Sequence, residues 1–202
     1  CNLKCIMCPW QKIASELDGE AVMQPDIWQA VQPHLPRIQS VDFTGGGEPL
    51  LQPHLVQWVH DAHSAGCETG ILTNALLLDE IKANALIEAG IDWICASMDG
   101  ATADMYHKIR RGSDFERVCR NVAALSRLRR GKRPKLMINF VLMKVNIDQV
   151  EQMVSLAARL GVDQLNFKQC DVIRGKHGRG LGLFASEADK AIRQLEKRLT
   201  KA

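Results

Sequence analysis

Three of the seven cysteines in this 202-residue chain stand among its first eight residues, at Cys1, Cys5 and Cys8. Thiolates crowded so closely onto one loop suit a soft metal better than they suit core packing. A structural zinc site usually needs a second Cys or Cys/His pair, and a four-cysteine iron–sulfur site needs a fourth thiolate. The other cysteines are single and scattered: Cys67, Cys95, Cys119 and Cys170. Three ligands on a four-iron cluster would leave one iron open for a substrate or cofactor.

A second chemical feature is the glycine run Gly45, Gly46 and Gly47, which is followed by Glu48 and Pro49. Glycines allow the backbone to approach a ligand closely because no side chain stands in the way. A carboxylate and backbone carbonyls would suit a bound ammonium group, since charge-assisted hydrogen bonds are the stronger ones. By itself the run is equally typical of a tight turn between a strand and a helix, and the sequence leaves both interpretations open.

The elements that must position these residues alternate between strands and helices. The sequence predicts five strands, at residues 40–44, 69–73, 93–97, 136–143 and 164–168. It predicts helices at 25–35, 54–65 and 80–89, a helix from a Ser113/Glu116 capping box to about 130, one starting at Asn146 with Gln149, and one from Ser186. Strict alternation requires parallel strands joined by crossover helices, in either an open doubly wound sheet or a (β/α) barrel.

In both architectures the chemistry sits at the carboxyl ends of the strands. Unusual residues lie in or directly after the predicted strands: the glycine run, Asn74, Ser97, Asp99, Asn139, Asn146 and Gln169. Asp99 is equally suited to cap a turn. The cysteine loop would lie on the same rim if a strand came directly before Cys1, and this sequence has no such strand.

Composition excludes several classes of protein. No apolar run approaches the roughly 18 residues of a membrane span, and no signal peptide is recognisable. An odd number of cysteines without a paired framework indicates a reducing compartment, so we expect a cytoplasmic protein. The basic run at 127–133 lacks the interleaved aromatic residues that stacking on bases requires, and nucleic-acid binding is not expected. We expect His60 and His63 to be exposed polar residues rather than metal ligands.

These residues together resemble the radical S-adenosylmethionine (SAM) enzymes, and the resemblance runs from Cys1 to about Lys168. It is carried by the Cys1, Cys5 and Cys8 spacing, the segment Thr-Gly-Gly-Gly-Glu-Pro at 44–49, Ile-Leu-Thr-Asn at 71–74, and Ser-Met-Asp-Gly at 97–100 followed by Tyr106 and Arg110-Arg111-Gly112. It implies an α/β fold, a partial (β/α)6 TIM-like barrel of the radical SAM type. We expect residues 1–202 to form this core domain, truncated at its N-terminus and lacking the first strand.

The resemblance also implies two cofactors, a 4Fe–4S cluster and SAM. Cys1, Cys5 and Cys8 would bind three irons, and SAM would chelate the fourth through its amino and carboxylate groups. The SAM ammonium would contact Gly45, Gly46 and Gly47, with Glu48 closing the motif. Further SAM contacts are expected from Met7, Asn74, Ser97 and Arg110, the last through the SAM carboxylate. Arg111 is the alternative to Arg110, and Asn139, Val141 and residues near Gln169 are candidates for the adenine pocket.

As to function, the resemblance implies an oxidoreductase or maturase in which one electron from the cluster cleaves SAM. The resulting 5′-deoxyadenosyl radical would abstract hydrogen from a peptide or protein side chain. The alternatives are a small-molecule substrate, such as a nucleotide or cofactor precursor, and an iron–sulfur electron-transfer or scaffold protein without catalysis. The motifs are most similar to the subgroup with a cysteine-rich SPASM or twitch extension, which we expect to lie outside this chain. A reductant such as flavodoxin or ferredoxin is the expected partner.

Overall fold

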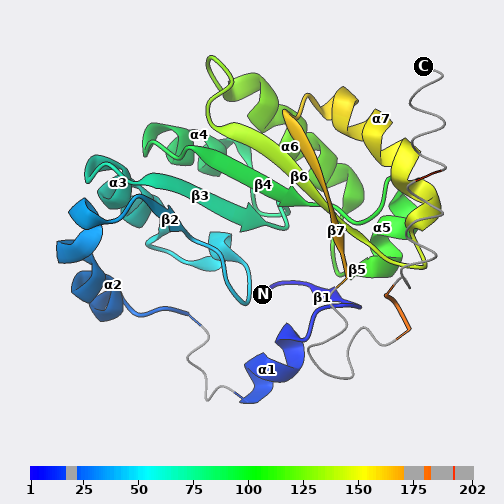
Figure 1. The fold of residues 1–202 in the computed structure, drawn as a ribbon, viewed down its shortest axis with the longest axis horizontal. Helices are drawn as coiled ribbons and strands as arrows, with labels where there is room; N and C mark the ends of the chain where they lie inside the picture. The colour runs from blue at the N-terminus through cyan, green and yellow to red at the C-terminus, as the bar shows by residue number, and fades with distance from the viewer. Residues whose placement is uncertain (17–21, 171–179, 183–192, 194–202) are drawn as a thin grey trace.

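The computed structural model describes residues 1–16, 22–170, 180–182 and 193 (Figure 1). Its main sheet contains five parallel strands in the order β2-β3-β4-β6-β7. These strands are β2 (Ser40–Asp42), β3 (Glu68–Thr73), β4 (Trp93–Ser97), β6 (Lys135–Leu142) and β7 (Gln164–Gln169). All five were predicted from the sequence, with bounds that differ by two residues or fewer.

Four helices connect consecutive strands of this sheet: α3 (Leu55–Ser64), α4 (Glu80–Glu88), α6 (Phe115–Leu128) and α7 (Val150–Leu160). The strands lie side by side in chain order, so every crossover advances in the same direction across the sheet. Right-handed crossovers that advance in one direction place their helices on one face (Figure 1). A doubly wound sheet would reverse its strand order, so the order decides for the barrel type. The predicted fold class, α/β in the form of a partial barrel, is confirmed.

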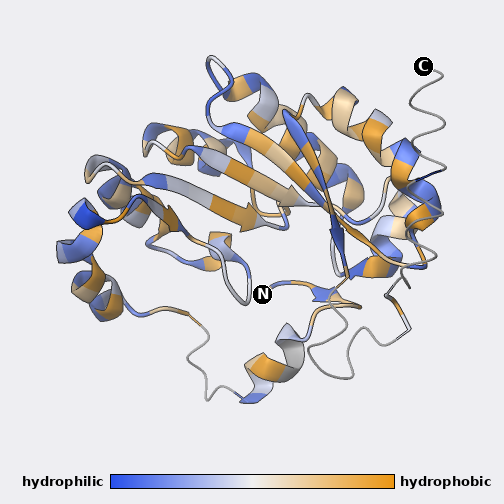
Figure 2. Cartoon of the chain, viewed as in Figure 1, coloured by the Kyte–Doolittle hydropathy of each residue, from blue (hydrophilic) through white to orange (hydrophobic). Residues whose placement is uncertain are grey.

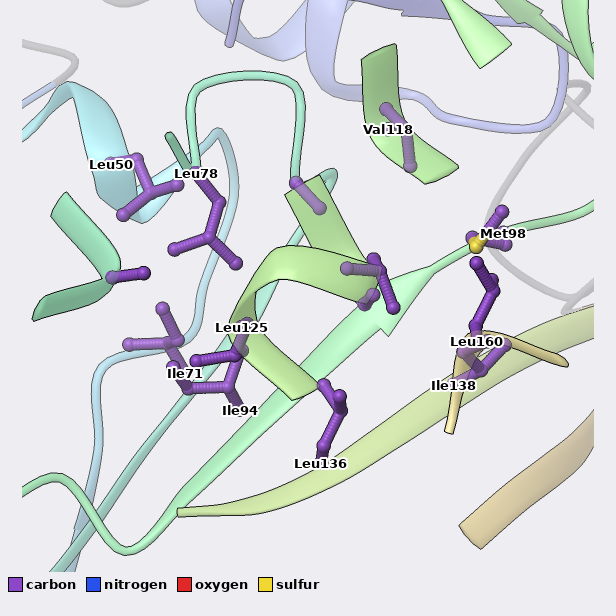
Figure 3. Close-up of a cluster of buried hydrophobic side chains, with 14 of the residues drawn as sticks. Leu50, Ile71, Leu78, Ile94, Met98, Val118, Leu125, Leu136, Ile138 and Leu160 are labelled. Carbon is purple, nitrogen blue, oxygen red and sulfur yellow. The ribbon is translucent and has the colours of Figure 1, made fainter. Parts of the chain in front are cut away.

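The hydrophobic core fills the space between the sheet and these helices. Alternate residues of the central strands point into it, including Ile94 of β4 together with Leu136 and Ile138 of β6, all with 0% exposure. Figure 3 shows Leu125 of α6 close to Ile71 and Ile94. Each such side chain contributes about 1.5–3 kcal/mol when it is fully buried. In Figure 2, β3 and β4 turn orange toward their carboxyl ends, whereas β7 is mostly blue.

The residues between these core positions point to the opposite face of the sheet, because side chains alternate along a strand. Ser97 of β4 pairs in register with Asn139 of β6, which pairs with Asn166 of β7. The Asn166 side-chain amide donates a hydrogen bond of 3.0 Å to Asn139 Oδ1. This face is therefore polar near the carboxyl ends of the strands.

A small antiparallel ladder, which sequence reasoning missed, joins the cysteine loop to the rest of the fold. Its strands are β1 (Lys4–Cys5) and β5 (Arg110–Arg111). β5 directly follows the helix α5 (Ala103–Ile109), which was also missed. Two-residue strands carry no periodicity, so only the three-dimensional pairing shows them.

The remaining helices are short, and all but one lie in the first 51 residues of the chain. They are α1 (Trp10–Glu16), α2 (Pro25–Val31), and the 3-10 helices η1 (Gln32–Arg37), η2 (Pro49–Leu51) and η3 (Ile147–Gln149). The single helix predicted at 25–35 is thus split into α2 and η1. None of the described helices is long and apolar enough to cross a lipid bilayer.

Two predicted helix caps are wrong. Asp114, rather than Ser113, caps α6 by accepting a hydrogen bond from the backbone N–H of Arg117. Ser113 instead lies 3.1 Å from the hydroxyl of Tyr106. Asn146 precedes η3 without capping it, because its side chain bonds the ends of neighbouring strands. The helix predicted from Ser186 lies outside the described residues.

Candidate functional site

A cavity of about 430 Å³ opens at the carboxyl ends of the strands, next to the cysteine loop. Ten of the eleven predicted site residues line it: Cys1, Cys5, Met7, Cys8, Gly45, Gly47, Glu48, Asn74, Ser97 and Arg110. They come from five separate parts of the chain, so the fold brings together residues that are far apart in the sequence.

The cysteine loop is held in place by backbone hydrogen bonds and by the burial of Leu3. Cys5 pairs with Arg110 in the β1–β5 ladder, and Ile6 N–H donates to the carbonyl of Ile109 over 2.9 Å. Leu3 is buried, with 4% exposure. Cys1 and Cys8 are exposed and Cys5 is half-buried, so all three thiols remain accessible from the cavity. Burial raises the pKa of the Cys5 thiol, and the nearby Arg110 partly opposes this effect.

The three thiols do not converge on a single point. No group of three or more His, Cys, Asp or Glu side chains within the described residues could hold one metal ion. A four-iron cluster has no such requirement, because each thiolate binds a different iron atom. The donor set therefore fits a cluster better than it fits a mononuclear site.

Two of the three glycines line the cavity, and the third packs against an aromatic ring. Gly45 and Gly47 line the cavity, and Gly47 has a φ of 110°, a region that favours glycine. Gly46 does not line this cavity, because the ring of Trp10 packs directly on its backbone. A Cβ atom on Gly46 would collide with that ring. At Gly46, therefore, the group that closely approaches the backbone is the ring of Trp10 rather than the predicted ligand.

Glu48 is a buried carboxylate that ties the glycine turn to β3. Its Oε1 accepts from the hydroxyl of Thr73 at 2.6 Å and from Leu50 N–H at 3.1 Å, and its Oε2 accepts from Asn74 N–H at 2.8 Å. Burial raises the pKa of Glu48, and these hydrogen bonds limit the rise. The carboxylate therefore shapes the wall of the cavity through its bonds to the protein itself.

Asn74 holds the cysteine loop against the sheet. Its side-chain amide donates to Asn2 Oδ1 at 2.8 Å, and its Oδ1 accepts from Leu76 N–H at 3.0 Å. The next residue, Ala75, has a φ of 59°, so the chain turns sharply after Asn74. Ser97 lies at the end of β4 and faces the same cavity.

Arg110 and Asp99 form a buried ion pair at the cavity wall. Arg110 Nη2 lies 2.7 Å from Asp99 Oδ2, and the side chains are 9% and 0% exposed. Asp99 does not cap a turn, because its Oδ1 accepts from Val141 N–H at 2.8 Å. Arg110 Nε has no hydrogen-bond partner among the described residues. Burial would lower the pKa of Arg110, but the charges of Asp99 and Cys5 outweigh it and raise that pKa.

Several lining residues were outside the predicted set of contacts or only candidates for it. The cavity is lined by three residues that the sequence analysis names for the adenine pocket, Asn139, Val141 and Gln169. The neighbouring Cys170 lines it too. Leu72, Thr73 and Lys168 line it too and were missed. The alternation of side chains along β7 places Lys168 on the same face as Asn166, and this signal could have identified it.

The remaining histidines and cysteines behave as the sequence indicates. His60 and His63 are exposed on α3, on the helical side of the sheet. Cys67 and Cys95 are buried with 3% exposure, and Cys119 is half-buried. Burial raises the pKa of Cys95 to about 11. None of these three thiols lines the cavity next to the cysteine loop.

Comparisons with known proteins agree with this geometry. The family model described as Radical SAM superfamily matches residues 1–157. A curated relative, "Probable GTP 3′,8-cyclase" of Sulfurisphaera tokodaii, is 28% identical over 200 residues, covering 98% of this chain and 59% of the relative. A second, "PqqA peptide cyclase" of Gluconobacter oxydans, is 31% identical over 163 residues, covering 79% of this chain and 44% of the relative.

A solved structure shows the same fold. Streptococcus suis SuiB bound to precursor peptide SuiA superposes with a TM-score of 0.78 at 17% identity, covering 100% of this chain and 44% of SuiB. The chain thus spans between about two fifths and three fifths of the length of these three proteins.

Proposed function

The chain belongs to the radical SAM superfamily, and we propose that it is the core of an enzyme that binds a 4Fe–4S cluster and SAM at the carboxyl edge of its sheet. In this proposal Cys1, Cys5 and Cys8 bind three irons of the cluster. Residues 1–202 act as the core domain, and a SPASM or twitch extension belongs to the rest of the protein.

One observation carries the proposal: the three thiols face a cavity whose wall also carries Arg110, and the Nε atom of Arg110 has no hydrogen-bond partner among the described residues. An electron-transfer protein needs thiols around its cluster, but it has no use for a ligand-sized cavity beside them. Pockets with a few convergent polar groups are typical of small-molecule and cofactor sites. The cavity therefore favours an enzyme over the electron-transfer or scaffold alternative.

The walls of the cavity suit the parts of SAM. The backbone at Gly45 and Gly47 offers carbonyl groups to an ammonium group, and Glu48 fixes that turn in place. Arg110 presents a buried N–H group without a partner, which fits a carboxylate. Ser97 and Asn139 offer a hydroxyl and an amide on the adjoining wall, and Met7 offers a polarisable sulfur for an aromatic ring. Asn74 contributes by holding the cysteine loop.

A cluster held by Cys1, Cys5 and Cys8 would supply one electron for the reductive cleavage of SAM, and the resulting radical chemistry would remove hydrogen from the substrate. The protein's part is to hold the cofactors in register and to keep water away from a reactive species. Leu3, Leu72 and Val141 supply apolar cover along the cavity walls.

A peptide or protein side chain is the substrate we propose first. The peptide cyclase among the relatives and the peptide bound to SuiB support this class. A nucleotide or other small molecule is the second candidate, because relatives named GTP 3′,8-cyclase cover nearly the whole chain. In either case a flavodoxin or ferredoxin is the proposed electron donor, in the cytoplasm.

The test is SAM cleavage by the full-length protein. The protein is reconstituted anaerobically with iron and sulfide, reduced with dithionite and mixed with SAM, and 5′-deoxyadenosine is quantified by chromatography. We expect its formation in proportion to protein, and none from a Cys5→Ala control. Protein that carries a proven 4Fe–4S cluster yet yields no 5′-deoxyadenosine would overturn the enzyme proposal in favour of electron transfer.

A further inference from the structure

The Asp99–Arg110 pair has a geometry that points beyond SAM binding. We propose that Arg110 is the cation that sets the electrostatic environment of the cluster ligand Cys5, and that Asp99 is a fixed counter-charge that offsets part of its effect. The inference rests on the proposed function, because it requires a cluster at Cys5.

The first support is the placement of the guanidinium group. Arg110 Nη1 lies 3.9 Å from Cys5 Sγ, and Arg110 Nη2 lies 2.7 Å from Asp99 Oδ2. The two backbones are paired in the β1–β5 ladder, so the Cα atom of Arg110 is fixed opposite that of Cys5. The cation therefore stands between a ligand thiol and a carboxylate, in contact with both.

The second support is the rigid mounting of Asp99. Its Oδ1 accepts from Val141 N–H at 2.8 Å, which fixes the carboxylate to the end of β6. Asn146, with 0% exposure, donates from Nδ2 to the carbonyls of Asp99 and Val141 at 2.9 Å each and accepts at Oδ1 from Met143 N–H at 2.8 Å. Asp99 thus sits on a closed network of backbone bonds and cannot follow Arg110 if the loop moves.

The third support is the incomplete hydrogen bonding of the Asp99–Arg110 pair. Arg110 is nine-tenths buried and its Nε has no partner in the described part of the chain. Asp99 Oδ2 lies 2.7 Å from Nη2 in the ion pair and has no other polar partner among the described residues. A pair evolved only for stability would leave fewer buried groups unsatisfied. The incomplete bonding is consistent with a guanidinium that is held in position for a negative neighbour.

The expected consequence is electrostatic. Reduction adds a negative charge to the cluster, and charges in a poorly solvated site act strongly on one another. A fixed cation at Cys5 favours the reduced state, whereas the carboxylate behind it offsets part of that effect. Loss of the cation and loss of the carboxylate must therefore change the reduction potential in opposite directions.

The experiment measures the midpoint potential of the cluster in full-length protein without SAM, by reductive titration followed with electron paramagnetic resonance. Arg110→Gln should shift the potential to more negative values, and Asp99→Asn should shift it to more positive values. The double variant should lie between the two single variants. Asp163→Asn, which alters an arginine pair at the opposite end of the sheet, is the matched control and should leave the potential unchanged.

A merely structural role predicts a different pattern, in which both single variants loosen the loop and shift the potential in the same direction. That result, or unchanged potentials in loaded protein, would overturn the inference. If Asp99→Asn does not fold, Arg110→Lys decides: the inference requires it to stay closer to wild type than Arg110→Gln, and equal shifts would contradict it. These outcomes are separate from the proposed function, since cluster loading is verified first and SAM cleavage is not involved.

Discussion

The sheet carries an arginine–aspartate pair at each end, and the two pairs are built differently. At the amino end, Arg129 and Asp163 form an ion pair in which Arg129 also donates to the carbonyls of Pro134 at 3.3 Å and Gly161 at 2.8 Å. Asp163 Oδ2 also accepts from Leu136 N–H at 2.9 Å, at the start of β6. Both carboxylate oxygens of Asp163 accept hydrogen bonds, and the pair connects the segment before β7 to the start of β6.

At the carboxyl end, Asp99 is more deeply buried than Asp163, yet the Asp99–Arg110 pair is less completely bonded. Its arginine keeps an unpaired Nε and contacts a cysteine thiol at the wall of a cavity. Buried groups that are fully satisfied stabilise a fold, whereas unsatisfied ones require a further explanation. The difference indicates that the pair at the amino end stabilises the fold, whereas the pair at the carboxyl end belongs to a candidate ligand-binding site.

The largest expected effect is on cluster binding, and it should distinguish the Cys5 thiol at the carboxyl end of the sheet from the Cys67 thiol at the amino end. Cys5→Ala at the carboxyl end should abolish the visible absorbance of the reconstituted cluster, because three ligands are the minimum for this site. Cys67→Ala, whose thiol donates to the carbonyls of Leu35 and Ile38, should keep the full absorbance and lose about 1–2 kcal/mol of stability. Absorbance spectra and iron counts measure this, and a complete cluster in Cys5→Ala would refute the ligand assignment.

A second comparison removes one carboxylate at each end in protein without its cluster. Asp99→Asn leaves a buried guanidinium without its counter-charge, so the free energy of unfolding should fall by about 3–5 kcal/mol. Asp163→Asn should cost about 1–3 kcal/mol, because Arg129 retains two carbonyl acceptors. Urea titrations give both values. Equal losses would mean that the two pairs do not differ as described.

A third comparison divides the carboxyl end itself into structural and ligand-facing parts. Gly46→Ala should destabilise the protein by about 1–3 kcal/mol, because the new methyl group collides with Trp10. Gly45→Ala meets nothing within 4 Å, so its stability should stay within about 0.5 kcal/mol of wild type. Gly45 lines the cavity, however, so SAM affinity should fall in Gly45→Ala. Equilibrium dialysis with SAM and urea titration distinguish the two variants, and equal stability losses would speak against the assignment.

The smallest expected effect is a pH dependence at the amino end. Burial would raise the pKa of Asp163, but its hydrogen bonds from Arg129 and Leu136 outweigh this and lower it. A lowered folded-state pKa gives stability that is present above the unfolded value of about 3.9 and is lost as the pH falls through the folded value. The stability difference between wild type and Asp163→Asn should therefore shrink below about pH 4. Urea titrations across the acidic range test this, and a difference that grows there would be contrary to the expected sign.

The sequence predicted the strands from local signals, whereas the barrel and most of the predicted cavity residues came from the resemblance to radical SAM enzymes. Short apolar runs mark β4 and β6, and the cysteine spacing marks the loop. It could not predict the β1–β5 ladder, the ring of Trp10 on Gly46 or the pairing of Asp99 with Arg110. Each of these depends on segments that meet only after folding, and two-residue strands or single contacts leave no period to detect.

The central claim is that the incompletely bonded end of the sheet holds the cluster and SAM together. The most direct test uses SAM labelled in its amino group with a heavy nitrogen isotope, added to the reduced full-length protein. Electron–nuclear double resonance should then show the labelled nitrogen coupled to the cluster, as expected if SAM takes the iron that Cys1, Cys5 and Cys8 leave open. A loaded and reduced cluster with no coupling to the label at saturating SAM would contradict the account.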